Sequence, residues 1–484
     1  MSKIDLAFIG NGIIATVAAL KIKEKHPDLD VVIIGSAHRP FSASVAAGAM
    51  QAVFCEVEET FRKVPREREI FNIGLEARTL WRALLEKFGL KDIITAESTI
   101  MYRRKQGTLF EEVNFEAACE VANEYKCIDD VSSHDLEKIF CGNLKPADVI
   151  AKKFAGEFAI DTEQFFLQAQ KLLEKMGVAL IDDMAETIVP SSQGVDVILQ
   201  NNKRLHASRV VIAAGTESPK LLPPDFAMVP MYHGVGTSMV LNSAPPTYSG
   251  LDVVIRTPNR GGAQCGMHIV PRSSGKFYLG ASNFFSYETP AHRIESIRYL
   301  IDICDQELFG KQVVYNTKAE LLLGSRPKTV DGYPIVGAYK ACPAVFVATG
   351  TYRIGLTIAP VIAAEICRWH EGQQASDAFK NCSPERRLHS YASMEVAIRY
   401  YSESRLSNLV EHGILDLRDQ KAMADKKIEL ESTARNFNAE IVKRHGFSHD
   451  FVVDPDMYSI LMQIEVSGGR TCKPTQEQNR RRAI

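Results

Sequence analysis

A glycine-rich turn, GNGIIA at residues 10–15, lies between an apolar run at 4–9 and a segment at 13–23 with the composition of a helix. A second apolar run, residues 31–34, follows a His-Pro-Asp turn. A buried strand, a tight turn, a helix and another buried strand make a βαβ unit. The sequence therefore predicts a parallel sheet with both faces covered.

This turn has the G-x-G-x-x-A spacing of a dinucleotide-binding loop. Gly10 permits the tight turn, Gly12 lets the backbone approach a pyrophosphate, and Ala15 permits close packing of the helix on the strand. The N-terminus of the helix attracts the phosphate charge. A glycine turn without a ligand would have the same local pattern, but the position within a βαβ unit favours a nucleotide site.

One position departs from the usual nucleotide-binding pattern. The second strand of such a unit normally ends in an acid that binds the ribose hydroxyls, whereas Gly35-Ser36 stands here. Ser36 can make one hydrogen bond to a ribose. Binding of a 2′-phosphate through His38 or Arg39 is a second interpretation that the sequence leaves open.

Further apolar runs extend this sheet and add a second one. Residues 209–214 and 345–348 each end in glycine within two residues, as strands do when they deliver a ligand loop. Shorter runs separated by turn-rich segments lie between them, at 253–256, 268–270 and 277–281. This alternation is typical of antiparallel sheet. We predict an α/β fold in which pieces of a nucleotide-binding domain are interleaved with an antiparallel-sheet domain.

The composition is that of an ordinary globular protein and argues against several partners. Of 484 residues, 45% are hydrophobic and 24% charged, and the net charge of −2 gives no reason to expect nucleic acid. No secretory signal is recognisable, and the longest apolar stretch, 345–366, contains Arg353 and Pro360, so no membrane span is predicted. The ten cysteines form no C-x-x-C pair. We expect a cytoplasmic protein with reduced thiols and no metal site.

The chain changes character after about residue 372, where charged helices are predicted. Ser383-Pro384-Glu385 has the pattern of a helix start, with an N-cap, a proline in the first position and an acid in the first turn. A second charged helix is predicted over residues 417–445, ending before Gly446. We hypothesise that this extension, residues 373–484, packs on its own protein or on a second copy, because its apolar face needs burial. Covering a site entrance or docking a partner protein are further possibilities.

Four ordered blocks resemble the D-amino acid oxidase family of FAD-dependent enzymes, and within it glycine oxidase. The loop SVAAGAM, 44–50, resembles the small-residue loop beneath the flavin, and VVIAAGTES, 210–218, resembles the second glycine-ended strand. GSRPKTVDGYPIVG, 324–337, is similar to the most specific block of the family, and ATGTYRIGL, 348–356, to its closing flavin-binding segment. The resemblance covers residues 1–372, so the extension lies outside it.

The resemblance implies a non-covalently bound FAD in a Rossmann-like, GR2-type domain. That domain would comprise residues 1–90, 150–222 and 325–372, and a substrate domain would comprise 91–149 and 223–324. Small side chains in the flavin loop let backbone amides reach the ring, and a helix N-terminus stabilises reduced flavin. The residues expected to bind FAD are Gly10, Gly12, Ile13, Ile14, Ala15, Gly35, Ser36, Ser42, Ala43, Ala46, Ala47, Gly48, Ala49, Val189, Ala214, Gly215, Thr351, Tyr352, Ile354, Gly355, Leu356 and Thr357.

Three residues carry the expectation for the substrate. In the family, the arginine of the R-P block binds the substrate carboxylate with a two-pronged bond, and it matches Arg326. Arg353 matches a second family arginine at the pocket, although it could instead be the structural partner of a backbone carbonyl or a buried acid. His268 stands where glycine oxidase has a substrate-facing tyrosine. It could carry charge and bind a second acidic group, or be an uncharged histidine packed between strands.

These resemblances imply an oxidoreductase that oxidises the C–N bond of a small amino acid or related amine. Hydride would pass from the substrate to flavin N5, the imine would be hydrolysed, and oxygen would reoxidise the flavin with release of hydrogen peroxide. No catalytic base is required if the amine arrives neutral. A dehydrogenase of the same fold with a quinone or carrier as acceptor is one alternative, and a flavin-binding complex subunit without turnover is another.

Overall fold

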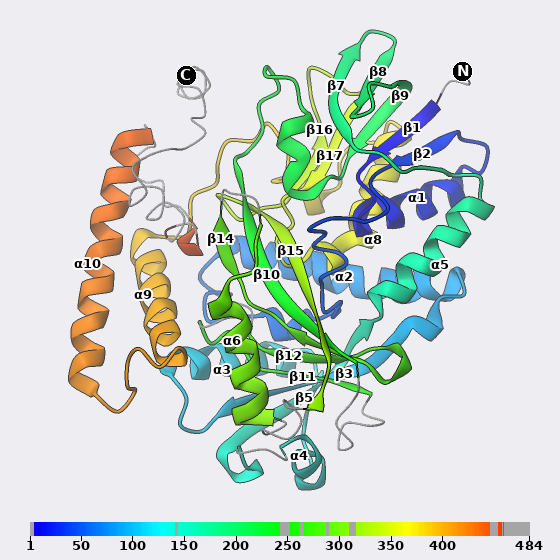
Figure 1. Cartoon of the computed structure of the whole chain (residues 1–484). Helices are drawn as coiled ribbons and strands as arrows, with labels where there is room; N and C mark the ends of the chain where they lie inside the picture. Colours follow the sequence, from blue (N-terminus) through cyan, green and yellow to red (C-terminus); the bar gives the residue numbers. More distant parts are fainter. Residues whose placement is uncertain are drawn as a thin grey trace.

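The protein, here a computed structural model, consists of two sheets with surrounding helices and an α-helical C-terminal extension (Figure 1). This mixed α/β arrangement confirms the predicted fold class. The residues that the structure describes are 4–140, 144–242, 252–261, 266–286, 290–308, 316–445, 454–456 and 458.

The first sheet is mostly parallel and contains both strands of the predicted βαβ unit. Its strands follow the order β16-β17-β9-β1-β2-β6, in which β16 runs antiparallel to β17, and the β7-β8 hairpin continues it beside β9. The strands are β1 (Ile4–Ile9), β2 (Val31–Ile34), β6 (Ala179–Ile181), β7 (Ala185–Ser191), β8 (Gly194–Leu199), β9 (Arg204–Ile212), β16 (Ile335–Ala338) and β17 (Val345–Thr349).

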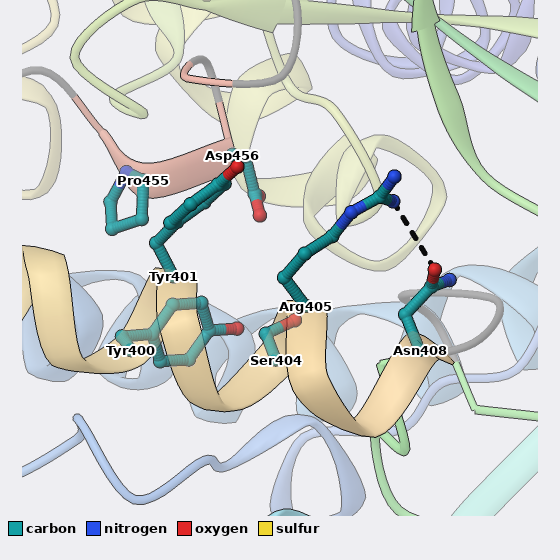
Figure 2. A pocket seen from close by; sticks show the side chains of 7 residues that line it. All are labelled: Tyr400, Tyr401, Ser404, Arg405, Asn408, Pro455 and Asp456. Carbon is teal, nitrogen blue, oxygen red and sulfur yellow. Dashed lines mark hydrogen bonds between the residues drawn. The ribbon is translucent and has the colours of Figure 1, made fainter. Parts of the chain in front are cut away.

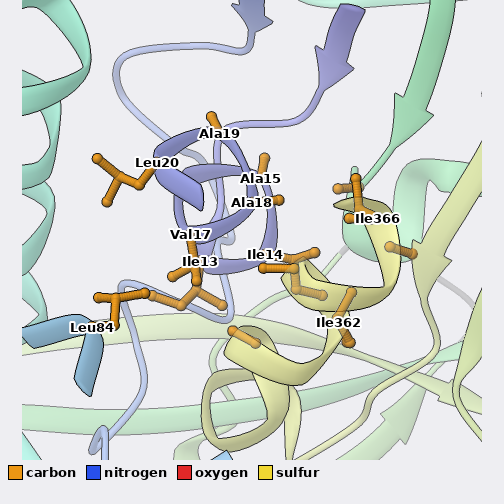
Figure 3. Packing of buried hydrophobic residues seen from close by; sticks show 14 of the residues in the cluster. Ile13, Ile14, Ala15, Val17, Ala18, Ala19, Leu20, Leu84, Ile362 and Ile366 are labelled. Atoms are coloured by element: carbon orange, nitrogen blue, oxygen red, sulfur yellow. The ribbon is translucent and has the colours of Figure 1, made fainter. Parts of the chain in front are cut away.

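Both faces of this sheet are covered, because its strands are apolar on both sides. One face packs on the helices α1 (Ile13–Lys25), α2 (Pro65–Lys87), α5 (Thr162–Lys175) and α8 (Gly355–His370). The other face packs on the β7-β8 hairpin and on the segment that follows β9. Figure 3 shows α1 against α8, with Ile14 beside Ile362 and Ile366. Buried alanines in α1 allow this close approach of the two helices.

The second sheet is predominantly antiparallel, as predicted, although β11 pairs with β3 in parallel. The helices beside it are α3 (Leu109–Glu124), α4 (Ser133–Ile139) and α6 (Ile294–Ile303). Its strands are β3 (Ile94–Arg104), β4 (Ile128–Asp130), β5 (Val149–Ile160), β10 (Met231–Leu241), β11 (Val253–Arg256), β12 (His268–Pro271), β13 (Phe277–Gly280), β14 (Phe284–Ser286) and β15 (Ala319–Thr329).

The extension contains two long helices that lie side by side, α9 (Met394–Glu411) and α10 (Gln420–His445) (Figure 1). The predicted helix start at Ser383 is wrong, because α9 begins at Met394 with Ser393 as its N-cap. Side chains of this segment instead form hydrogen bonds with residues distant in the sequence. For example, Glu385 accepts from the backbone N–H of Lys340 at 2.8 Å. The predicted end of the second helix at Gly446 lies outside the described residues, as does the arginine-rich segment at 480–482.

The predicted domain boundaries stay a prediction. By strand pairing, all of β5 and all of β15 belong to the second sheet, although residues 150–160 and 325–329 fall within the predicted FAD-binding domain. Along the described part of the chain, no helix is both long and apolar enough to cross a bilayer.

Candidate active site

The carboxyl ends of three parallel strands meet at one edge of the first sheet. Ile9 of β1 is in register with Ile34 of β2 and with Ile212 of β9. An open crevice at the carboxyl edge of such a sheet is where α/β proteins bind ligands. The predicted cofactor loops begin just after these residues, at Gly10, Gly35 and Ala214-Gly215.

Gly10 and Gly12 lead into the N-terminus of α1. Gly10 has a φ of +107°, and a Cβ there would collide with the carbonyl oxygen of Ala213. Gly12 is the N-cap of α1, which has no side-chain cap and no acid in its first turn. The Ser44 hydroxyl accepts from the backbone N–H of Ile13 at 3.1 Å. The first turn, which includes Ile14 and Ala15, therefore has the electrostatic character of an anion site.

The loop after β2 is held by Asn11 rather than by an acid of its own. Asn11 Nδ2 donates to the carbonyl of Ser36 at 2.8 Å, and a Cβ on Gly35 would lie 2.6 Å from the Asn11 side chain. Arg39, half-buried, donates to the carbonyl of Asn11 at 3.2 Å. An acid reaches this loop from the end of β6, where Asp182 accepts from the N–H of residue 37 at 2.8 Å.

The loop of small residues at 42–49 connects the two sheets. Tyr278 of β13 donates to the carbonyl of Ala46 at 2.8 Å, and Arg272 donates to the carbonyl of Ala47 at 2.7 Å. The second sheet thus fixes this loop through its backbone, which leaves the small side chains to pack. The remaining predicted residues of this loop are Ser42, Ala43, Gly48 and Ala49.

The segment 351–357 opens α8 in the same way as the glycine turn opens α1. α8 begins at Gly355 without a capping side chain or an acid in its first turn. Trp81 of α2 donates to the carbonyls of Leu356 and Thr357, both at 3.0 Å. The rest of the predicted segment, Thr351, Tyr352 and Ile354, precedes this turn. An uncapped helix N-terminus stabilises negative charge, which agrees with the expected role.

Arg326 on β15 has no acidic partner among the residues described. Its Nη1 donates to the carbonyl of Ser282 at 3.2 Å and to Oδ1 of Asn283 at 3.0 Å. Gly236 on β10 leaves room for the guanidinium, because a Cβ there would collide with it. Gly324, two residues earlier on β15, packs on the loop 42–49. A partly exposed positive charge held by neutral groups therefore lies near the predicted flavin loop.

Arg353 is paired with an acid. It forms an ion pair with Glu56, whose other oxygen accepts from Arg256 Nη1 at 2.8 Å. Burial would raise the pKa of Glu56, but the charges of Arg353 and Arg256 outweigh it and hold this pKa below its usual value. A second acid, Glu58, lies 3.9 Å from Arg353. This geometry agrees with the alternative in which Arg353 is a structural partner of an acid.

His268 is buried between the flavin loop and the second sheet. Its ring stacks on Tyr278 with 5.5 Å between centroids, and a Cβ on Gly48 would lie 2.9 Å from it. Burial lowers the pKa of His268 to about 3, and the neighbouring Arg256 acts in the same direction. The ring is therefore neutral at physiological pH, which argues against its binding a second acidic group of the substrate.

Val189 stands apart from the other predicted cofactor residues. It lies on β7, which joins the first sheet only through β8, and 45% of its surface is exposed. Its role in cofactor binding stays a prediction. Among the residues that the structure describes, no group of three or more His, Cys, Asp or Glu side chains is arranged to hold a metal ion.

The sequence matches the family model DAO, FAD dependent oxidoreductase, over residues 5–369. The chain belongs to the DAO family. Membership confirms the predicted family, the FAD cofactor and the expectation of an enzyme.

Two curated proteins are similar to this chain over part of their length. A bifunctional protein ThiO/ThiG of Synechocystis sp. is 24% identical over 238 residues, which are 47% of this chain and 33% of that protein. Its namesake in Nostoc sp. is 30% identical over 194 residues, 40% of this chain and 28% of that protein. The match thus spans about a third of the length of these curated relatives.

Solved structures show that this DAO-family chain shares its fold with amine-oxidising enzymes. Glycine oxidase from Geobacillus kaustophilus superposes with a TM-score of 0.65 at 18% identity, covering 80% of this chain and 99% of that one. Iminodiacetate oxidase from Chelativorans sp. BNC1 gives 0.63 at 14% identity, covering 78% and 98%. At such identities the likeness establishes the fold alone.

The residues present fit FAD. Two helix N-termini, those of α1 and α8, lack caps and acids, as a pyrophosphate and a reducible ring require. The amide of Gln51, which follows the small-residue loop, is fully buried, and neither of its polar atoms has a partner among the described residues. The polar edge of a flavin is the kind of group that would satisfy such an amide.

Sequence reasoning missed the charged groups around the arginines. Only Lys328 had a local signal, because residues two apart on a strand share a face and Arg326 was already singled out. The other charged groups come from separate segments that only the fold brings together, and they are Glu56, Glu58 and Arg256. The neutral amide of Asn283, which accepts from Arg326, was missed for the same reason.

Proposed function

We propose that this enzyme oxidises the C–N bond of a small amino acid or related amine, and that Arg326 binds the substrate carboxylate. The main support is the charge of Arg326, which is partly exposed, held by neutral acceptors and close to the small-residue loop. A guanidinium makes two parallel hydrogen bonds to a carboxylate. Glycine and iminodiacetate, named in the similar structures, both carry such a group.

The chemistry needs little from the side chains beyond alignment. When bound, FAD supplies a two-electron acceptor. Arg326 would fix the carboxylate so that the C–H bond next to the nitrogen is aligned for hydride loss. The product imine takes up water and yields a carbonyl compound and ammonia or an amine. With oxygen as the final acceptor the second product is hydrogen peroxide.

The test is anaerobic addition of an amino-acid panel to the holoenzyme while the flavin absorbance is recorded. Bleaching by one compound is expected, and Arg326→Met should raise the concentration for half-bleaching roughly 100-fold, the equivalent of about 3 kcal/mol for a charged hydrogen-bonded pair. Arg298→Met is the matched control, because Arg298 is an exposed arginine on α6. Equal bleaching by Arg326→Met and wild type would contradict the proposed role of Arg326.

The acceptor and the cellular location belong to the same proposal. Peroxide release in air would favour an oxidase, whereas reduction of a quinone without peroxide would favour the dehydrogenase alternative. Membership in an oxidoreductase family disfavours a subunit without turnover. We propose a cytoplasmic location because the described cysteines are free thiols, as expected in a reducing compartment.

A further inference from the structure

The C-terminal extension reaches the end of strand β15, which carries Arg326. The backbone N–H of Asp454 donates to the carbonyl of Val330 at 3.4 Å. The Asp454 carboxylate lies between two cations, 2.6 Å from Arg66 and 3.3 Å from Lys328. Gly332 leaves room for this arrangement, since a Cβ there would lie 2.9 Å from the carboxylate. The extension is therefore docked on the strand by its backbone and by its charge.

Lys328 depends on the extension for its counter-ions. Its ammonium group lies 3.3 Å from Asp454 and 3.2 Å from Asp456, and within the described ranges it forms ion pairs with no other acid. Only 4% of Lys328 is exposed. A buried ammonium without a counter-ion is costly, so the acids of the extension complete the electrostatics of β15. The pKa of Asp454 agrees, because burial would raise it but Lys328 and Arg66 hold it below its usual value.

A continuous set of contacts joins Lys328 to Arg326. The Lys328 ammonium lies 4.5 Å from the centre of the Tyr352 ring, a cation–π distance. The Tyr352 hydroxyl accepts from Nδ2 of Asn283 at 2.7 Å, and Oδ1 of the same amide accepts from Arg326 at 3.0 Å. Asn283 is therefore oriented by Tyr352, and its orientation decides whether it presents oxygen or nitrogen to the guanidinium.

The helix α9 makes a second approach to the same region. The Tyr400 hydroxyl donates to Glu58, the acid that lies near Arg353. Figure 2 shows Tyr400 with Pro455 and Asp456 around one pocket, so α9 and the segment 454–456 line the same pocket. Two parts of the extension thus contact the residues that surround the predicted substrate arginines.

We propose that Asp454 and Asp456 of the C-terminal extension are positioning residues for substrate binding, which hold Arg326 in place through Lys328, Tyr352 and Asn283. This inference rests on the proposed function of Arg326. It assigns the extension a part in the active site of this chain, beyond the region matched by the family model.

The test uses full-length holoenzyme and acetate, a carboxylate without an amine, titrated against the flavin spectrum. Asp456→Asn should raise the dissociation constant of acetate roughly tenfold, as expected for groups coupled in one network. With a reducing amino acid, KM should rise by a similar factor while kcat changes less than about twofold. Asp456→Glu should restore both values. Glu395→Gln is the matched control, because it removes an exposed ion pair within the extension.

Two further variants separate positioning from simple loss of stability. Tyr352→Phe removes the hydroxyl that Asn283 contacts and leaves the extension intact, and it should weaken acetate binding to a similar extent. The double variant Lys328→Met with Asp456→Asn should bind acetate no more weakly than Lys328→Met alone, because Asp456 acts through Lys328.

The outcomes distinguish this inference from the proposed function. Loss of binding in Arg326→Met but wild-type binding in Asp456→Asn and Tyr352→Phe would overturn the positioning role alone. Wild-type binding in Arg326→Met would overturn the proposed function itself, and the positioning role with it.

Discussion

The neutral state of His268 has a consequence for stability. Its pKa of about 3 in the folded protein lies below the value of about 6.5 for an exposed histidine, so below pH 6.5 the unfolded chain takes up a proton that the folded chain does not. The free energy of unfolding is therefore unaffected by this histidine above pH 6.5, and it decreases as the pH falls from 6.5 towards 3. We expect the free energy of unfolding to fall by about 2 kcal/mol more in wild type than in His268→Gln between pH 7 and pH 5.

Urea titrations at the two pH values measure this difference. Parallel pH profiles for wild type and His268→Gln would show that the histidine is protonated in the folded protein, which would restore the charged interpretation.

Glu56 holds two arginines together, so its charge matters more than that of a surface acid. Glu56→Gln removes the acid that Arg353 and Arg256 share, and Glu58 lies farther from Arg353, at 3.9 Å. We expect the free energy of unfolding to fall by about 2 kcal/mol, since Glu56 is only partly buried. Glu97→Gln, which breaks the exposed pair with Arg82, is the control and should change stability little. If chemical denaturation gave similar free energies of unfolding for Glu56→Gln and Glu97→Gln, Arg353 would not be bound by Glu56.

At the scale of elements, the two glycines of the α1 turn should respond differently to alanine. A Cβ at Gly12 meets only the Ser44 hydroxyl, at 3.2 Å, so Gly12→Ala should fold normally but bind FAD at least tenfold more weakly, because the backbone can no longer approach the pyrophosphate. Gly10→Ala should not fold properly, because of the collision with Ala213 and the positive φ. Circular dichroism of the apoproteins and FAD fluorescence titration separate the two effects. Normal FAD affinity in Gly12→Ala would contradict the assignment of the loop.

Elements whose signals are local were predictable from the sequence. The strands and helix around residues 10–15 are specified by apolar runs and a glycine turn within one short segment. The helix start at Ser383 had an equally good local pattern and failed, because Arg386 instead pairs with the buried Asp331 and donates to the carbonyl of Tyr333. Long-range hydrogen bonds of this kind override capping preferences, and no local pattern reports them.

In the candidate site, too, some residues could be predicted from local sequence and others could not. Arg326 and the small-residue loop could be identified from ordered blocks of sequence. The environment that gives Arg326 its free charge could not, since Gly236 and Asn283 come from distant strands and loops. The pairing of Arg353 with Glu56 likewise joins residues 297 positions apart in the chain. Counter-ions are a property of the folded molecule, and among the described residues Arg353 has an acidic partner whereas Arg326 has neutral acceptors.

At the scale of the whole molecule, a buried ion cluster joins the extension to the second sheet. Glu411 at the end of α9 pairs with Arg104 of β3 and lies 3.9 Å from Arg260, which is fully buried. Arg260 also pairs with Glu307 at 2.7 Å, and burial, which would raise the pKa of Glu307, is outweighed by that arginine. Glu111 pairs with both arginines as well, at 2.8 Å from Arg104 and 3.1 Å from Arg260, so Glu411 adds an acid of the extension to a cluster that the second sheet already holds together.

We therefore expect the extension and the catalytic part to unfold in one cooperative transition. Glu411→Gln should lower the free energy of unfolding by about 2 kcal/mol, because it removes the charged partner that the extension gives Arg104, while Glu111 stays paired with that arginine. Glu395→Gln, whose pair with Arg435 is exposed on α9 and α10, should leave the transition unchanged. Chain truncation after Gly372 should yield aggregated protein, since it exposes Phe110 and Phe285, which pack on residues of α9. Calorimetry of the two variants measures the difference, and a separate low-temperature transition for the extension would mean that surface contacts alone hold it to the enzyme.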